Sequence, residues 1–310
     1  MTIFVLLIAG MLLLWLGAEC ILWGGVSLAL RAGLPILIVG MTLMGYCTGI
    51  PEVVVSVQAS MLDKGDISIG NVIGSNIANT GLILGLSTFC CPIKIQQQSL
   101  KIDIPLMIAA SLLLCLLLAF TNDIGRPIGL LFLLGLVGYT YWSVKEGRKN
   151  FQLVAAEKEQ IEHYRIDKLW IEILLIGFGF FALFCGGRTF LIGAIQLAKI
   201  YDISDAVIGV TIIALGTSLP EMAVSLIAVI KKYGDISLGN IVGSNIFNIL
   251  AIVGLAATIH PLKIQDITWV DYSFMTFLAC AMWLLSFSKK TFGRSEGAFF
   301  VLSYCCYIAY

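Results

Sequence analysis

Two glutamates lie in apolar surroundings, within closely similar segments of this sequence. Glu52 ends a segment that begins at Gly40, and Glu221 ends the matching segment that begins at Gly209. An ionised carboxylate in such surroundings is costly unless it faces a partner, water or a bound cation. The helix cores expected around both segments contain no Lys or Arg that could pair with them. We therefore expect both glutamates to be cation ligands.

A proline directly precedes each glutamate. Pro51 and Pro220 have no N–H, and a proline ring crowds the carbonyl four residues earlier. This frees backbone carbonyls near Thr48 and Thr217. Irregular backbone inside a membrane is tolerated only where protein, water or ions satisfy it. The prolines therefore predict a broken helix beside each carboxylate, with carbonyl oxygens available to a cation.

Neutral side-chain oxygens recur in a second pair of matching segments. They are spaced by four residues and so share a helix face: Asn71, Ser75 and Asn79 in one segment, and Asn240, Ser244 and Asn248 in the other. We expect some of the polar side chains to join neighbouring helices by hydrogen bonds: Asn71, Asn76, Asn240 and Asn245. We expect the others to face the carboxylates: Ser75, Asn79, Ser244 and Asn248.

Together these groups form a ligand set made only of oxygen atoms. Such sets suit hard cations, namely calcium and sodium, with magnesium and manganese as further members of the class. The nine cysteines lie mostly in apolar runs without Cys/His metal spacing, which argues against zinc or copper. Two carboxylates balance one calcium ion or two sodium ions, so either cargo avoids an unpaired charge in a low dielectric. Electrostatics alone does not distinguish sodium from protons as the counter-ion.

The elements that must position these residues are membrane helices. The 310 residues are 59% hydrophobic and 12% charged, with a mean hydropathy of +0.97, whereas soluble domains carry about a quarter charged residues. The zero net charge argues against a nucleic-acid partner. We predict an all-α membrane protein with ten transmembrane helices, at 3–22, 34–61, 68–90, 103–120, 127–144, 169–187, 204–231, 237–259, 269–287 and 296–309.

Basic residues predict the orientation of these helices. The first apolar run has no basic flank and is too long for a signal peptide, so it is expected to remain as a helix. If the N-terminus lies outside, fourteen Lys and Arg residues face the cytoplasm and five face outwards. Because positive charge collects on the cytoplasmic side, both termini are expected outside and the hydrophilic connection 145–168 inside. The expected location is the cell (inner) membrane.

The chain resembles itself at a displacement of about 169 residues. The match includes Gly-Asp-Ile-Ser-Ile-Gly-Asn-Val-Ile-Gly-Ser-Asn from Gly65 and Gly-Asp-Ile-Ser-Leu-Gly-Asn-Ile-Val-Gly-Ser-Asn from Gly234. Five predicted helices separate the copies, so the second copy must enter the membrane from the opposite face. This predicts two inverted five-helix repeats, the architecture in which transporters place a site at mid-membrane. The expected parts are residues 1–144, with a repeat core at 40–92; the loop 145–168; and residues 169–310, with a core at 209–261.

These segments resemble the cation/calcium exchanger superfamily, whose repeats carry Gly-Thr-Ser-x-Pro-Glu and Gly-Asn-x-x-Gly-Ser-Asn patterns. The likeness covers essentially the whole chain and is nearest to compact prokaryotic sodium/calcium exchangers. It implies a central calcium site made by Glu52 and Glu221 with carbonyls of Thr48 and Thr217, bordered by Asn79 and Asn248. It implies one peripheral sodium site at Gly45 and Ser75, and a symmetry mate at Ala214, Thr217, Ser218 and Ser244.

The resemblance also implies alternating access, in which the first and sixth helices slide against the other eight. Glu19 and Arg188, at matching places in these two helices, are expected near opposite membrane surfaces rather than as an ion pair. The sequence departs from the family pattern at Gly49, which offers no hydroxyl where the pattern has Ser. Asn248 is a neutral amide where some relatives carry Asp. Both departures bear on sodium coupling and on the number of ions exchanged.

Several functions remain open from the residues. A secondary antiporter exchanging calcium for sodium fits the site, with protons or potassium as alternative counter-ions. A cation channel with paired acidic rings is a second class and would conduct without obligatory counter-transport. A membrane-embedded enzyme, with the two glutamates as a catalytic dyad, is disfavoured because His163 and His260 both fall in predicted connections. The sequence therefore predicts no enzyme activity and no cofactor other than the transported ions.

Overall fold

A computed structural model describes the chain except for residues 1, 122, 150–160, 202–213 and 310, and except for the side chains of residues 214, 288 and 289. The helices of the first half are α1 (Thr2–Ala32), α2 (Ile36–Val39), η1 (Gly40–Met44), α3 (Gly45–Thr48), α4 (Ile50–Met61), α5 (Gly65–Ile77), η2 (Ala78–Ile83), α6 (Leu84–Cys90), η3 (Ser99–Asp103), α7 (Ile104–Phe120) and α8 (Arg126–Gly147). The connection that follows holds the short helix η4 (Glu162–Tyr164). Those of the second half are α10 (Leu169–Ile200), α12 (Ala214–Thr217), α13 (Leu219–Ile230), α14 (Gly234–Phe247), η6 (Asn248–Val253), α15 (Gly254–Ile259), α16 (Trp269–Lys289) and α17 (Arg294–Ala309).

The helices are long and apolar enough to cross a membrane. Among the described residues, seven helices reach this length and composition, and a pair of helices bent by 46° between Thr48 and Ile50 forms an eighth span. The shorter helices α13 and α17 lie where the sequence predicts the seventh and tenth spans. The chain is therefore an all-helical membrane protein with about ten spans, as the sequence predicts.

Two of the predicted helix ends are wrong. The first helix continues to Ala32 instead of ending at residue 22, and the sixth continues to Ile200 instead of residue 187. The sequence prediction ended each helix once it was long enough to cross the hydrocarbon layer. The chain contains no breaking signal until Gly33, which has a φ of +65°, and Pro35.

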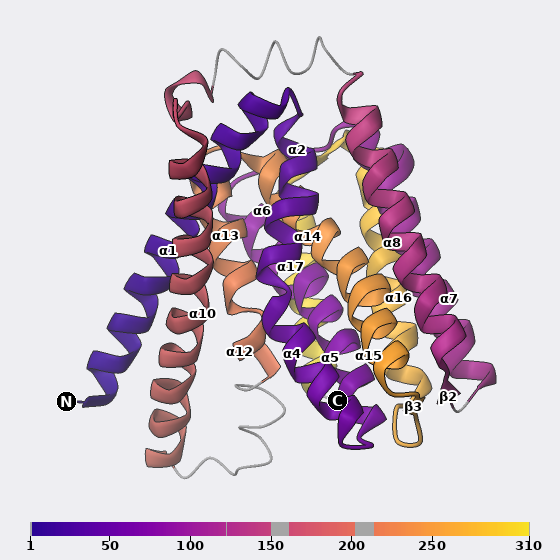
Figure 1. The fold of residues 1–310 in the computed structure, drawn as a ribbon. Coiled ribbons are helices and arrows are strands. Elements are labelled where there is room, and N and C mark those ends of the chain that lie inside the picture. The colour runs from indigo at the N-terminus through magenta and orange to yellow at the C-terminus, as the bar shows by residue number, and fades with distance from the viewer. Residues whose placement is uncertain (1, 122, 150–160, 202–213, 310) are drawn as a thin grey trace.

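Helices α1 and α10 lie side by side at one edge of the bundle (Figure 1). Their backbones approach closely at glycines, because a Cβ atom built on Gly17 would lie 2.7 Å from the Gly179 carbonyl oxygen, and one built on Gly179 would lie 2.7 Å from the Gly17 carbonyl oxygen. Small residues commonly permit such contacts between membrane helices. Helices α7, α8 and α16 lie at the opposite edge, and the repeated helices α4, α5, α14 and α15 lie between (Figure 1).

Two short strand pairs show the inverted relation of the halves. Strand β1 (Ile93–Lys94) pairs with β4 (Thr291–Phe292), and β2 (Asp123–Ile124) pairs with β3 (Leu262–Lys263), both antiparallel. Strand β1 follows α6 and pairs with the strand between α16 and α17. In the same way, β3 follows α15 and pairs with the strand between α7 and α8. The N- and C-terminal marks lie at the same end of the bundle (Figure 1).

A partly buried ion pair joins the C-terminal end of α1 to the N-terminal end of α10. The Arg31 Nε atom donates to Glu172 Oε2 at 2.9 Å, and the Ser27 hydroxyl donates to Glu172 Oε1 at 2.6 Å. The Arg31 guanidinium also donates to the carbonyl oxygens of Ile166 and Asp167. These bonds attach the end of the central connection to the α1–α10 pair.

Replacing Arg31 by Met is expected to destabilise the protein more than the loss of an exposed ion pair does, because the buried Glu172 carboxylate would lose its charged partner. The side chain of Glu172 is 1% exposed, and that of Arg31 is 39% exposed, which reduces the effect below that of a fully buried pair. Thermal unfolding of detergent-purified protein measures the change. The control is Arg165→Met, whose partner Glu162 is exposed and whose loss should cost under about 1 kcal/mol. Equal effects would contradict the prediction.

Glu19 has a partner that the repeat alignment does not indicate. Its carboxylate forms an ion pair with the Lys231 ammonium at 2.5 Å, at the end of α13. This contact joins α1 to the repeated helix of the second half that carries Glu221. The pair is partly buried, since the side chains are 17% and 29% exposed.

Candidate cation-binding site

Both glutamates lie in the first turn of a helix that follows a break. Helix α3 ends at Thr48 and α4 begins at Ile50, while α12 ends at Thr217 and α13 begins at Leu219. Each proline is the second residue of its helix, in the first turn, where a missing N–H is tolerated. A carboxylate in a first helical turn is stabilised by the helix dipole. The helices thus break where the two prolines predict.

The two glutamates face each other across the halves. Glu52 is 1% exposed and Glu221 is 2% exposed, and their carboxylates interact electrostatically. Each carboxylate also interacts with a threonine side chain of the other half, Glu52 with Thr217 and Glu221 with Thr48. The Ser218 hydroxyl lies 3.5 Å from Glu52 Oε1. The inverted repeat therefore brings residues about 169 positions apart into one cluster.

The asparagines connect the repeated helices. Asn71 Nδ2 donates to the Glu52 carbonyl oxygen at 3.3 Å, and Asn240 Nδ2 donates to the Glu221 carbonyl oxygen at 3.2 Å. Each also donates to a serine hydroxyl at 2.9 Å, on α4 and α13 respectively. These bonds hold the backbone at each glutamate against its neighbouring helix. The expectation that Asn71 and Asn240 make interhelical hydrogen bonds is confirmed.

A second set of amide bonds crosses between the halves at the π-helical turns η2 and η6. Asn79 Nδ2 donates to Asn245 Oδ1 at 3.1 Å, and Asn248 Nδ2 donates to Asn76 Oδ1 at 3.0 Å. Asn76 and Asn245 therefore make the interhelical bonds expected of them. Because Asn79 and Asn248 use their NH₂ groups in this way, their amide oxygens remain as acceptors.

Four buried oxygen atoms of the expected cation ligands have no hydrogen-bond donor among the described residues. They are the Oε2 atoms of Glu52 and Glu221 and the Oδ1 atoms of Asn79 and Asn248. Native proteins rarely leave buried acceptors without a partner, because desolvation is costly. Four acceptors, placed symmetrically with respect to the repeats, instead match the oxygen ligands of a hard cation.

The peripheral residues are placed less symmetrically. The Ser244 hydroxyl donates to the Gly45 carbonyl oxygen at 3.3 Å, a contact between residues that the resemblance assigned to different sodium sites. A Cβ atom on Gly45 would lie 2.9 Å from the Ser244 backbone nitrogen, so glycine is required for this approach. Ser75 is buried on α5. Ala214 begins α12, and its side chain is outside the described part of the chain.

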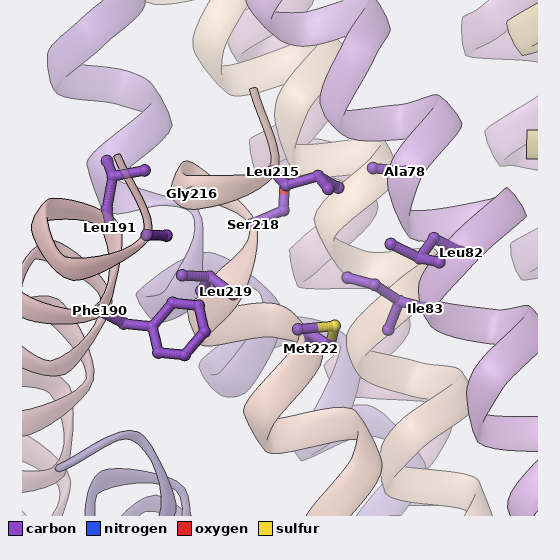
Figure 2. A pocket seen from close by; sticks show the side chains of 11 residues that line it. Ala78, Leu82, Ile83, Phe190, Leu191, Leu215, Gly216, Ser218, Leu219 and Met222 are labelled. Carbon is purple, nitrogen blue, oxygen red and sulfur yellow. The ribbon is translucent and has the colours of Figure 1, made fainter. Parts of the chain in front are cut away.

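A hollow of about 240 Å³ adjoins the second half of the cluster (Figure 2). Its wall comes from α10, η2 and the α12–α13 break, and includes Ala78, Leu82, Phe190, Leu215, Ser218 and Met222. The surface of the hollow is apolar, and Ser218 contributes to its wall, while the Ser218 hydroxyl lies 3.5 Å from Glu52 Oε1. The hollow therefore borders the cation ligands on one side of the site.

The sequence analysis missed two buried carboxylates outside the repeat cores, Glu172 and Asp103. Asp103 is fully buried at the end of η3 and accepts a hydrogen bond from the Tyr139 hydroxyl at 3.2 Å. Asp103 is the first residue of the helix that the sequence predicts at 103–120. A tyrosine in the next predicted helix was the available signal, but sequence spacing alone does not bring the two together.

Comparisons with known proteins agree with this geometry. The family described as sodium/calcium exchanger protein matches residues 2–145 and 171–310. The chain is 33% identical to the inner membrane protein YrbG of Escherichia coli, over 98% of the chain and 95% of that relative. It is 28% identical to the sodium/calcium exchanger MaX1 of Methanosarcina acetivorans, over 98% and 97%. A solved structure of the sodium-calcium exchanger NCX_Mj superposes with a TM-score of 0.84 and 28% identity, covering 99% of this chain and 98% of that one.

Proposed function

The chain belongs to the sodium/calcium exchanger protein family, and we propose that it is a secondary antiporter that exchanges calcium for sodium by alternating access. Membership makes it a membrane cation exchanger and a transporter rather than an enzyme. The observation that carries the choice of a hard divalent cation is the set of four buried oxygens without donors, two of them carboxylate oxygens.

In this proposal the central ion lies between Glu52 and Glu221, with Asn79 and Asn248 beside it. The Thr48 and Thr217 segments contribute oxygens from the two helix breaks, and the second peripheral place adjoins Ser218. The buried acceptors and the electrostatic interaction of the two glutamates support this arrangement. Further ligands follow the expectation from the sequence: Gly45, Ser75, Ala214 and Ser244.

The α1–α10 pair is the part that we propose to move against the remaining helices. Its two helices pack on each other through glycines, which supports movement as a unit. The hollow lies between α10 and the α12–α13 break, so a displacement of α10 would change access to the site. The Glu19–Lys231 ion pair joins α1 to α13 and would have to change in such a movement.

We further propose that the protein lies in the cell membrane with both termini outside and the connection 145–168 in the cytoplasm. The distribution of basic residues supports this orientation. The position of both termini at one end of the bundle agrees with an even number of spans (Figure 1). The proposed repeat boundaries are residues 1–144 and 169–310.

Calcium uptake driven by a sodium gradient tests the proposed function. In proteoliposomes holding sodium inside, calcium-45 uptake is expected to exceed uptake without a gradient by about tenfold, and it should reverse when the sodium gradient is reversed. Parallel vesicles with a proton or potassium gradient serve as controls. Uptake that follows the proton or potassium gradient and ignores sodium would favour those counter-ions, and steady single-channel currents would favour a channel.

A further inference from the structure

The two helix breaks differ in the space beside them. In the second half, Ser218 lies at the break, and its hydroxyl lies 3.5 Å from Glu52 Oε1. The matching residue of the first half is Gly49, which has no side chain. The residue that matches Ala78 in the wall of the hollow is Phe247. The first repeat thus has glycine where the second has serine, and the second repeat has phenylalanine where the first has alanine.

The ring of Phe247 occupies the space beside Gly49. A Cβ atom built on Gly49 would lie 2.9 Å from Phe247 Cδ1 and 3.1 Å from Cε1, closer than ordinary packing allows. The ring stacks on Tyr46 with 4.8 Å between centroids. The Tyr46 hydroxyl shares a hydrogen bond with Thr140 on α8 at 2.8 Å, which holds the stack in place. A hydroxyl-bearing side chain at position 49 would therefore require the Phe247 ring, and with it the stack on Tyr46, to move.

The charge of the central cluster favours a load of two positive charges, and any further ion would need neutral oxygen ligands of its own. Glu52 and Glu221 supply two negative charges, while Asn79 and Asn248 donate amide hydrogens to other asparagines and are neutral. An aspartate at position 248 could not donate the bond to Asn76. In a buried site, cations are held most favourably when their charge equals that of the ligands. One divalent or two monovalent ions meet this condition.

We propose that Phe247 and Gly49 remove one of two symmetry-related monovalent sites, so that the protein exchanges two sodium ions for one calcium ion without net charge. The inference rests on the proposed function. The two remaining sodium sites are the centre of the cluster, between Glu52 and Glu221, and the site beside Ser218. Phe247 determines this ratio by occupying the place where the first half would otherwise hold a third ion.

The wild-type protein tests the ratio directly. Proteoliposomes with a fixed sodium gradient are clamped at different membrane potentials with potassium and valinomycin. The calcium gradient that gives zero net calcium flux is then measured at each potential. We expect no shift with potential. An exchange that moves one net charge would shift the balancing calcium ratio about 50-fold per 100 mV, and that result would overturn the inference.

A pair of double variants isolates the missing hydroxyl. Phe247→Ala with Gly49→Ser restores the space and the oxygen, whereas Phe247→Ala with Gly49→Ala restores the space and lacks the oxygen. We expect the serine variant to gain dependence on membrane potential and a steeper sodium activation, with the alanine variant unchanged from wild type. Identical behaviour of the two variants, both folded by size-exclusion chromatography, would overturn the role of Phe247. If either fails to fold, the wild-type potential measurement decides the proposal.

These measurements separate the inference from the function on which it rests. Sodium-driven calcium flux that depends on potential contradicts the two-for-one ratio and leaves the antiporter assignment in place. Calcium flux that is independent of sodium contradicts both. Flux coupled to sodium and independent of potential supports both.

Discussion

Replacing either Glu52 or Glu221 by Gln is expected to reduce sodium-driven calcium flux at least about 100-fold. The amide has nearly the shape of the carboxylate but no charge, so a calcium ion in the cluster would face one negative charge instead of two. An uncompensated charge in a buried site costs several kcal/mol, far more than the roughly 2.7 kcal/mol that a 100-fold loss requires. Calcium-45 uptake into proteoliposomes measures the effect.

Both variants are expected to remain folded, because neither glutamate has a basic partner in the described part of the chain that would be left unpaired. Size-exclusion profiles and thermal unfolding check this. The matched control is Glu162→Gln, an exposed glutamate in the central connection paired with Arg165, and its flux should stay within twofold of wild type. Flux above about one tenth of wild type in Glu52→Gln or Glu221→Gln would exclude that residue from the site.

The second large effect is expected from Gly243→Ala, which should lower the melting temperature by at least about 5 °C. A Cβ atom on Gly243 would lie 2.6 Å from Met41 Cα and nearer still to the Met41 carbonyl oxygen. Because these are backbone atoms of η1, they cannot rotate away, and overpacking of this kind costs about 3 kcal/mol or more. The displaced segment leads directly into Gly45 and Thr48 of the site.

Gly74 is the matched control, since it occupies the same place in the first repeat. A Cβ atom built there would meet no atom within 4 Å. Gly74→Ala should therefore change the melting temperature by less than about 2 °C, with a small gain from helix propensity. Thermal unfolding of both variants in the same detergent makes the comparison, and equal melting temperatures would show that the close approach to Met41 is unimportant for stability.

Much of the fold follows from the sequence because the repeat is so well preserved. Matching segments around Glu52 and Glu221, five apolar runs apart, require inverted halves. The proline before each glutamate predicts the helix breaks, which the structure contains. The lengths of α1 and α10 could not be read in this way, because the prediction ended each helix at one membrane thickness, whereas the helices continue to Ala32 and Ile200.

The site was only partly predictable for a similar reason. The types and spacing of the glutamates and asparagines indicate a cation, since they are costly in lipid without one. The contact of Ser244 with Gly45 and the ring of Phe247 beside Gly49 depend on side chains about 200 positions apart meeting across the halves. The sequence shows only that Gly49 lacks a hydroxyl. The structure shows that a Cβ atom at position 49 would lie 2.9 Å from the Phe247 ring, so the single variant Gly49→Ser is not a sufficient test of the missing hydroxyl.

The central claim is that Glu52 and Glu221 hold the same divalent cation, and equilibrium calcium-45 binding to purified protein tests it most directly. The account predicts one calcium ion per chain in the wild type, displaced by sodium, and no binding at the same calcium concentration in either Glu→Gln variant. Two calcium ions per chain, each lost with a different glutamate, or undiminished binding in either variant, would contradict it.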